Sequence, residues 1–510
     1  MKRFSPNTSL VSIIVIIISA WFILLVPFAV LGHGFLPSDD ALRHSAKVIS
    51  GRDWSDILVL RDGMAMDIHA GWHAILGLAH KITGWDAHSL VLFSVVFLFL
   101  FFCLPPLFLL RRPEAWVLTL FITLVLYPGF IWRLLLGRPY IWTMSAFALI
   151  LLIGPYLTPA PGIGQSPSQK NSRCWNNACR FSCRWIALLF ITFIIALSVW
   201  IHGCWYVFAL PVAAFFIAGK RKESLVLAIA SLAGIIIGTI LTGHPVVFLR
   251  QMLLHLFLVF GSNNLQRTLV TELRPALGST NIIFAAAILI IFRMLADRRT
   301  GKLPSNIRVL SSPAFVMTGI AFILGLATNR AWLDWGLPAF AVWMAEELGF
   351  FLDIKIPAYS GKRIVIAVLS GIALYIGSSS DVADRWSMTR PLDYIQQNDT
   401  KQREWLPGPG GIIYSDDMGV FFKTFYKNPH APWKYALGFE SALMPDEDLK
   451  TLRNIEENFG DPKYYEPWVK KMRPSDRLVV IGREGSPPKI EGLEWHYICL
   501  NTWIGRKPRK

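Results

Sequence analysis

The chain is dominated by apolar segments of about twenty residues, which short polar loops separate. A helix needs about 20 consecutive apolar residues to cross the hydrocarbon layer of a bilayer. Of the 510 residues, 54% are hydrophobic and only 16% are charged, and the mean hydropathy is +0.45. A soluble protein of this length requires more polar surface. The sequence therefore predicts an integral membrane protein that crosses the bilayer many times.

The hydropathy pattern predicts an all-α polytopic domain with about 11 transmembrane helices, spanning residues 1–380. The first apolar segment runs from about Ser9 to Leu31 and lacks a small-residue cleavage site, so we expect an anchor helix that is retained. The other ten helices are expected to begin near Ser89, Ala115, Tyr140, Trp185, Trp205, Leu225, Asn281, Pro313, Trp332 and Ile364.

The charges of the loops predict the orientation, because cytoplasmic loops of membrane proteins are rich in lysine and arginine. If Lys2 and Arg3 are cytoplasmic, alternate loops should be basic, and they are. The basic loops carry Arg111 and Arg112, Lys170 to Arg184, Lys220 to Lys222, Arg293 to Lys302, and Lys355 to Arg363. We therefore expect a plasma (inner) membrane protein with a cytoplasmic N-terminus and an extracytoplasmic C-terminal domain. The net charge of +16 follows from this topology, and we expect no nucleic-acid partner.

The polar tail, residues 381–510, predicts a small α/β domain. Strand-like runs at Gly411 to Tyr414 and Arg477 to Ile481 are separated by a helical pattern from Asp446 to Asn458. We interpret the acidic pair at 416–417 as a turn after the first strand. Substrate recognition or stability is the role that we expect for this domain.

The first large extracytoplasmic loop, residues 32–88, concentrates acidic and histidine residues. Asp39 and Asp40 directly follow the first span. Ser38 or Asp39 is a suitable N-cap for a helix that ends at Gly51. Two adjacent carboxylates at the mouth of a membrane span are costly unless they serve a function.

Asp39 and Asp40 are therefore the candidate catalytic residues. Carboxylates at this position can deprotonate an acceptor hydroxyl, and they would also suit a divalent cation that bridges a phosphate. Along the predicted helix, Asp39 and Arg43 are four residues apart, as are Asp40 and His44, so each pair can share one face. The competing interpretation is a set of solvated charges and helix caps.

A second helix in this loop is expected from Asp67 to Thr83, with His69 and His73 on one face. Two such histidines can bind a metal together with a carboxylate. Histidine pairs on helices are more often ordinary residues of a polar face, so we assign no metal site.

The run Asp39 to Ala46, followed by Gly51 to Trp54, resembles the first-loop signature of GT-C type glycosyltransferases. The resemblance is to the group of protein mannosyltransferases and aminoarabinose transferases. The segment Gly71 to Leu76 resembles the interfacial helix of that group. Asp40 stands where the group usually has Glu, and Arg52 interrupts its Gly-Asp-Trp motif, so the donor sugar is left open.

The resemblance implies transfer of a sugar from a polyprenyl-phosphate donor to an envelope glycan, lipid or protein acceptor at the outer face of the membrane. It makes Asp39 the main catalytic carboxylate, which activates the acceptor, with Asp40 supporting it. The phosphate leaving group needs cationic partners, for which arginine is well suited. The candidate substrate-binding residues are Arg43, His44, His69, His73, Arg138, Arg267, Arg274 and Arg330, with Arg133, His202 and His244 as further polar residues near the ends of spans.

Three other functions stay open at this point. A transporter or flippase of lipid-linked saccharides requires charged or broken helices at the bilayer midplane, and often internal repeats. A polymerase or ligase of lipid-linked glycans would place its arginines and histidines in a late loop. A non-enzymatic membrane scaffold would use the tail as a receptor-like domain.

Overall fold

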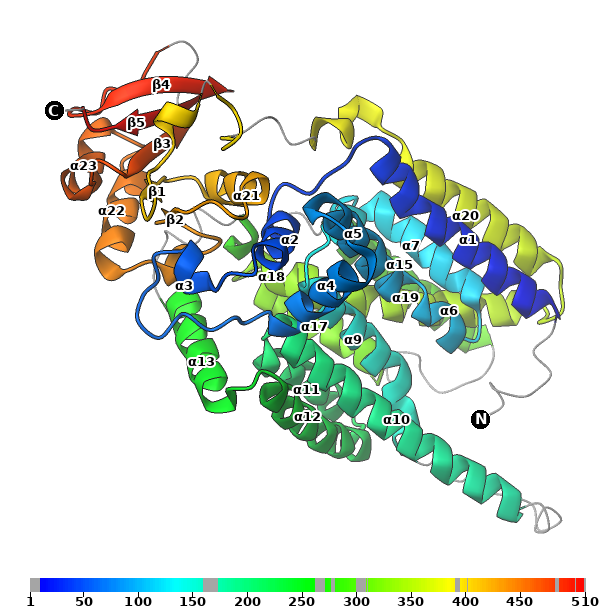
Figure 1. The fold of residues 1–510 in the computed structure, drawn as a ribbon. Coiled ribbons are helices and arrows are strands. Elements are labelled where there is room, and N and C mark those ends of the chain that lie inside the picture. Colours follow the sequence, from blue (N-terminus) through cyan, green and yellow to red (C-terminus); the bar gives the residue numbers. More distant parts are fainter. Residues whose placement is uncertain are drawn as a thin grey trace.

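The computed structural model describes residues 10–158, 173–261, 271–276, 280–299, 309, 311–389, 395–400, 402–481, 486–499 and 501–508. A bundle of long helices forms one part of the molecule, and a small mixed sheet with its own helices lies at one end of the bundle (Figure 1). The expected combination of a helical domain with a small C-terminal α/β region is confirmed.

Each of the eleven apolar segments contains a helix. These helices are α1 (Leu10–Gly32), α5 (Ala87–Cys103), α7 (Pro113–Leu126), α9 (Tyr140–Ile153), α10 (Arg173–His202), α11 (Ala209–Ile217), α12 (Arg221–Leu241), α15 (Thr280–Arg299), α17 (Pro313–Gly325), α19 (Leu337–Lys355) and α20 (Lys362–Ser379). Among the described residues, six helices are long and apolar enough to cross a membrane. The number of spans therefore stays a prediction.

The helices of the bundle differ in what surrounds them. Every side chain of α9 from Tyr140 to Leu152 is buried, so this helix lies in the core of the bundle. In contrast, α1 and α20 pack side by side at the outside and expose large apolar side chains, such as Ile17 and Leu369. Apolar surface of this extent is expected where a protein faces lipid.

The first loop folds into three helices, α2 (Asp40–Ser50), α3 (Trp54–Ile57) and α4 (Ala70–Thr83). Gly51 ends α2 with a φ of 61°, a left-handed conformation that glycine adopts without strain, as the sequence predicted. Helix α4 begins three residues after the predicted start, and the side chain of Asp67 accepts a hydrogen bond from the backbone nitrogen of His69 just before it.

The C-terminal sheet has the strand order β2-β1-β3-β5-β4. Strands β1 (Ile412–Tyr414), β2 (Lys434–Tyr435) and β3 (Arg477–Ile481) are parallel, whereas β4 (Glu494–Cys499) and β5 (Thr502–Arg506) add an antiparallel edge. Helices α21 (Met418–Lys427), α22 (Asp446–Glu457) and α23 (Glu466–Lys471) accompany the sheet. The two expected strands and the expected helix are present within one residue of their predicted bounds.

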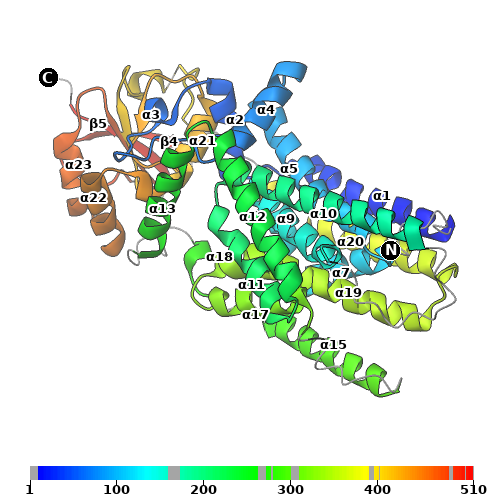
Figure 2. The same cartoon turned by 90° about the horizontal axis from the view of Figure 1, so that it is seen from below.

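The first loop is part of the hydrophobic core of the C-terminal domain. Trp54, Ile57 and Leu58 are buried in one apolar cluster with residues of β1, β2 and α21. The backbone nitrogen of Val59 donates to the carbonyl oxygen of Tyr435 at 2.9 Å. Figures 1 and 2 show α2 and α21 side by side, with α13 (Pro245–Gly261) lying along the C-terminal domain. The loop therefore joins the bundle to the sheet, and the candidate site lies at this junction.

Candidate functional site

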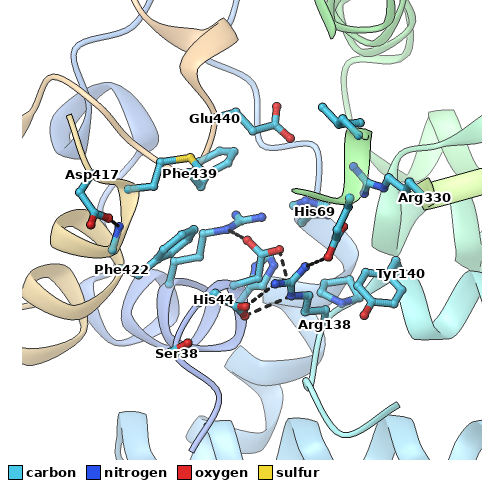
Figure 3. A pocket seen from close by; sticks show the side chains of 18 of the residues that line it. Ser38, His44, His69, Arg138, Tyr140, Arg330, Asp417, Phe422, Phe439 and Glu440 are labelled. Carbon is cyan, nitrogen blue, oxygen red and sulfur yellow. Dashed lines mark hydrogen bonds and ion pairs between the residues drawn. The ribbon is translucent and has the colours of Figure 1, made fainter. Parts of the chain in front are cut away.

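A cavity of about 730 Å³ lies where the first loop, the adjoining ends of the bundle helices and the C-terminal domain meet (Figure 3). The loop and the bundle contribute Ser38, Asp39, Asp40, Arg43, His44, His69, Arg138, Pro139, Tyr140, His202, Glu272, Leu273 and Arg330. The C-terminal domain contributes Asp416, Asp417, Met418, Gly419, Phe422, Phe439, Glu440, Glu456 and Ile481. Most of these residues are polar or charged, so the cavity suits a hydrophilic ligand.

The carboxylate of Asp39 is bound to the guanidinium of Arg138. Asp39 occupies the N-cap position of α2, but its side chain makes no capping hydrogen bond. Instead Oδ1 accepts from Nε of Arg138 at 3.1 Å, and Oδ2 pairs with Nη2 of the same side chain. The predicted capping role is thus wrong for the Asp39 side chain, because a guanidinium binds a carboxylate more strongly than a backbone N–H does.

Asp40 pairs with Arg43 within the same helix. Nε of Arg43 donates to Oδ1 of Asp40 at 2.6 Å, so the partner of Arg43 is Asp40, three residues away, and not Asp39 as the spacing suggested. Burial raises the pKa of Asp40, but the charges of Arg43 and Arg138 outweigh this effect and hold the pKa at about 2. Asp40 is therefore ionised at neutral pH and is a weak base.

Arg138 connects the acid pair to Glu272. Nη1 of Arg138 donates to Oε1 of Glu272 at 2.9 Å, and Nη1 of Arg133 donates to the same oxygen at 2.8 Å. Arg138 follows Gly137 in the turn before α9. Gly137 has a φ of 62°, and a Cβ added to it would lie 3.2 Å from the side chain of Val95. The turn therefore requires glycine, and it holds Arg138 toward the cavity.

Arg330 also lines the cavity, on the side of His69 and Tyr140 (Figure 3). It lies in α18 (Asn329–Ala331), next to a π-helical turn over Trp332–Gly336. Its Nε is 3.4 Å from Oδ2 of Asp334, whose Oδ1 accepts from Nε of Arg133 at 2.6 Å. The Arg330 side chain is 32% exposed, which leaves it more accessible than that of Arg138, at 16%.

Three histidines of the first loop, His44, His69 and His73, form one cluster. Nδ1 of His44 and Nε2 of His73 are 2.8 Å apart, and Nδ1 of His73 is 2.5 Å from Oδ2 of Asp67. His44 and His69 both line the cavity, whereas His73 lies behind its wall. Burial lowers the pKa of His44 well below its usual value and, with the charge of Arg43, lowers the pKa of His69 to about 3.

Histidine and carboxylate side chains are common metal ligands, and those near the cavity would have to be grouped to bind a metal ion. Among the described residues, no group of three or more His, Cys, Asp or Glu side chains is placed to hold a metal ion. The carboxylates of Asp39 and Asp40 are both occupied by guanidinium groups. A divalent cation bound to Asp39 would therefore have to displace Arg138.

Of the remaining predicted residues that the structure describes, one lines the cavity and the others do not. His202 lines the cavity, where its Nδ1 is 3.0 Å from Oγ1 of Thr143. Arg274 and His244 are exposed and are not among the lining residues. Arg267 lies outside the described residues.

The C-terminal residues of the cavity were missed by the sequence analysis. Phe439 covers the guanidinium of Arg43 at 3.9 Å, and Glu440 pairs with His255 of α13. Burial raises the pKa of Glu440, but His255 and Arg330 outweigh it, so its pKa is below the usual value. None of these residues lies in a motif, and only the docking of the two domains brings them to the cavity.

Asp416 and Asp417 connect β1 directly to α21, where the chain bends at Asp416 and Asp417 is the N-cap of the helix. The side chain of Asp417 caps α21 by accepting a hydrogen bond from the backbone nitrogen of Gly419 at 2.6 Å. Both acids also line the cavity, which a local sequence pattern does not reveal.

Solved structures resemble this chain, although no family model and no curated protein matches the sequence. The oligosaccharyltransferase of Archaeoglobus fulgidus in its apo form is similar, with a TM-score of 0.52 and 12% identity, over 94% of this chain and 70% of that chain. The same enzyme tethered to an acceptor peptide gives a TM-score of 0.51 at 12% identity, over 93% of this chain and 69% of that chain. This chain has the fold of the GT-C type membrane glycosyltransferases.

A further solved structure is ArnT from Cupriavidus metallidurans bound to undecaprenyl phosphate. Its TM-score is 0.48 at 10% identity, and the match covers 96% of this chain and 97% of that chain. The resemblance predicted from the first loop is thus confirmed at the level of the fold by the oligosaccharyltransferase.

Proposed function

We propose that this protein is a glycosyltransferase that moves a sugar from a polyprenyl-phosphate donor to an envelope glycan, lipid or protein acceptor at the outer face of the plasma membrane. The observation that carries the proposal is the contact of the acid pair, Asp39 and Asp40, with Arg138 in a polar cavity beside the bundle. The GT-C fold supports glycosyl transfer as the reaction class. The two carboxylates lie in the first loop, whose sequence resembles that of GT-C type glycosyltransferases.

Asp39 is the general base of the proposed reaction. Its carboxylate takes the proton from an acceptor hydroxyl while the hydroxyl oxygen forms a bond to the anomeric carbon. The bond from that carbon to the phosphate oxygen breaks, and the polyprenyl phosphate leaves with the bonding electrons. Asp40 is less suited to be the base, because its pKa is about 2 and it is held by Arg43.

The negative charge that develops on the phosphate needs a cation close by. Arg330 is the accessible guanidinium of the cavity, and Arg138 is the second candidate, although it is already bound to Asp39 and Glu272. The planar guanidinium fork suits phosphate oxygens and keeps its charge at every relevant pH.

The membrane topology belongs to the same proposal. With eleven spans and a cytoplasmic N-terminus, the first loop and the C-terminal domain lie on the extracytoplasmic side, where they enclose the cavity together. Exposed apolar residues along α12, such as Leu225, Ile229 and Leu232, are suited to contact lipid tails. A lipid-linked donor would then reach the cavity from the bilayer.

The test is transfer of radiolabelled sugar in membranes that contain wild type, Asp39→Asn or Asp40→Asn at matched protein levels. A panel of polyprenyl-phosphate sugars supplies the label. Asp62→Asn is the matched control, because Asp62 is an exposed acid of the same loop that does not line the cavity. We expect Asp39→Asn to lose about 10²- to 10⁴-fold in rate, and Asp62→Asn to resemble wild type.

Equal product from wild type and Asp39→Asn would contradict the proposed base. Movement of the intact lipid-linked sugar across the membrane of vesicles, without transfer to an acceptor, would instead favour the transporter or flippase function. Adding EDTA to the wild-type assay tests separately whether transfer requires a divalent metal ion, and we expect no loss of rate.

A further inference from the structure

Three imidazole rings lie together along one wall of the cavity. The ring of His69 meets that of His44 edge to face, with centroids 4.9 Å apart and an interplanar angle of 85°. On its other side, His69 stacks on His202 at 5.9 Å. All three side chains line the cavity, where Figure 3 labels His44 and His69. The catalytic step proposed above does not use any of these rings.

The hydrogen bond of His69 fixes which of its ring nitrogens carries the proton. Nδ1 is 3.2 Å from the carbonyl oxygen of Ile201, and a carbonyl oxygen can only accept. Nδ1 must therefore be the donor, and a neutral His69 has a bare Nε2. No described residue forms a hydrogen bond to this Nε2. Burial keeps the pKa of His69 at about 3, which is consistent with a neutral ring.

The backbone around His69 is held rigidly. Oδ1 of Asp67 accepts from the backbone nitrogen of His69 at 3.0 Å, and Oδ2 of Asp67 binds Nδ1 of His73. A Cβ at Gly71 would lie 2.6 Å from the Trp200 ring, and one at Gly203 would lie 3.0 Å from the carbonyl oxygen of Ile68. The start of α4 thus packs directly on the end of α10, so the ring of His69 is preorganised.

A neutral imidazole with a bare nitrogen is a hydrogen-bond acceptor without charge. It suits a hydroxyl donor better than a phosphate, which the arginines of the cavity would bind. His69 lines both the main cavity and an adjoining smaller one, and the residue is 8% exposed. His69, Asp39 and Asp40 all line the main cavity, so a sugar bound in front of the acid pair shares this cavity with the His69 ring.

We propose that Nε2 of His69 accepts a hydrogen bond from one hydroxyl group of the donor sugar and so helps to select the sugar that is transferred. His69 is a specificity-determining residue in this scheme, with Asp67 and Ile201 as the groups that position it. The inference rests on the proposed function, because it takes a glycosyl donor to be the ligand of the cavity.

The test is calorimetric binding of farnesyl-phosphate hexoses to the purified full-length protein in detergent, without acceptor. The probes are the glucose, mannose and galactose compounds, and then derivatives of the tightest binder that each lack one hydroxyl. For wild type we expect one derivative to bind about 10-fold more weakly than its parent. For His69→Phe we expect the parent to bind about 10-fold more weakly, with no further loss for that derivative.

Two variants guard against a trivial loss of structure. His69→Asn keeps an amide oxygen that can accept a hydrogen bond, so part of the discrimination should return. His244→Phe changes an exposed histidine outside the cavity and should discriminate like wild type. Size-exclusion profiles of all variants should match that of wild type.

The proposal is overturned if His69→Phe discriminates among the derivatives as wild type does. It is also overturned if wild type binds all derivatives equally, or binds none of the three hexose compounds. Failure here is separate from failure of the catalytic proposal. If Asp39→Asn abolishes transfer while His69→Phe keeps wild-type discrimination, the role of Asp39 as the base is supported and the contact of His69 with the sugar is refuted. If Asp39→Asn keeps transfer while His69→Phe loses discrimination, the contact of His69 is supported and the role of Asp39 is refuted.

Discussion

Asp39 and Arg138 are 99 positions apart in the sequence, yet the fold joins their side chains in a two-point ion pair. The pair links a candidate general base to a candidate phosphate-binding cation. Both oxygens of the Asp39 carboxylate are engaged by Arg138 in this state. We expect donor phosphate to draw Arg138 away from Asp39, which would free the carboxylate for the acceptor hydroxyl.

Arg138→Lys should therefore be damaging, although it keeps the charge. A lysine ammonium cannot reproduce the fork that contacts Asp39 and Glu272 together. We expect kcat/KM for sugar transfer to fall by about 10- to 100-fold, which corresponds to about 1.4 to 2.7 kcal/mol. Steady-state transfer kinetics measure the effect. Arg274→Lys, at an exposed arginine that does not line the cavity, is the matched control, and an Arg138→Lys enzyme of wild-type efficiency would contradict the role.

Phe439→Leu tests the contact between the C-terminal domain and the first loop. The Phe439 ring lies 3.9 Å from the guanidinium carbon of Arg43, and leucine removes the aromatic face but retains an apolar side chain. We expect thermal unfolding in detergent to show a loss of about 0.5 to 2 kcal/mol, together with a higher KM for the donor. Phe459→Leu is a suitable control, because Phe459 is 100% exposed. An unchanged KM would mean that the contact serves stability alone.

The buried histidines predict a loss of stability in acid. In the folded state His69 stays neutral down to its pKa of about 3, whereas in the unfolded chain it takes up a proton below pH 6.5. The unfolded state then binds more protons, so the free energy of unfolding falls as the pH falls from 6.5 toward 3. We expect His69 to account for about 2 kcal/mol between pH 7 and pH 5.

Thermal unfolding of wild type and His69→Asn at several pH values in this interval checks the prediction. The variant should lose less stability than wild type as the pH falls, because an amide does not titrate. Parallel pH profiles for the two proteins would show that His69 titrates as it does in the unfolded chain.

Replacing either of two glycines of α4 by alanine should change the stability of the protein, in opposite directions for the two positions. A Cβ at Gly71 would lie 2.6 to 2.8 Å from atoms of Trp200, whereas nothing lies within 4 Å of a Cβ at Gly77. We expect Gly71→Ala to destabilise the protein by about 1 to 3 kcal/mol through overpacking. Gly77→Ala should stabilise it by about 0.5 to 1 kcal/mol, since alanine favours the helix. Melting temperatures measured side by side test both, and an equal response would contradict the close packing of α4 on α10.

Local sequence patterns predicted much of the fold correctly. The apolar segments contain helices because about twenty consecutive apolar residues have few ways to satisfy their backbone other than helix formation. Gly51 ends α2 because a left-handed residue is needed there, and the runs at 412–414 and 477–481 form strands. These features depend on residues that are close in the sequence.

The pairing of the charges was harder to predict. The spacing suggested a contact of Arg43 with Asp39, but Arg138 binds Asp39 in the structure and Arg43 pairs with Asp40. Glu272 is a single acid without a motif, yet it binds two arginines of the site. Ion pairs of this kind depend on which helix ends the bundle brings together.

The sequence by itself determined that this chain is a membrane protein with an acid pair in its first loop and a small α/β domain at its C-terminus. Only the tertiary structure decided that Phe439, Glu440 and the acids after β1 close the cavity over that pair. The physical reason is that hydropathy and turn patterns act over a few residues. The docking of the loop onto the C-terminal core brings together side chains that are hundreds of positions apart in the sequence. Their charges interact strongly only when burial has removed the side chains from water.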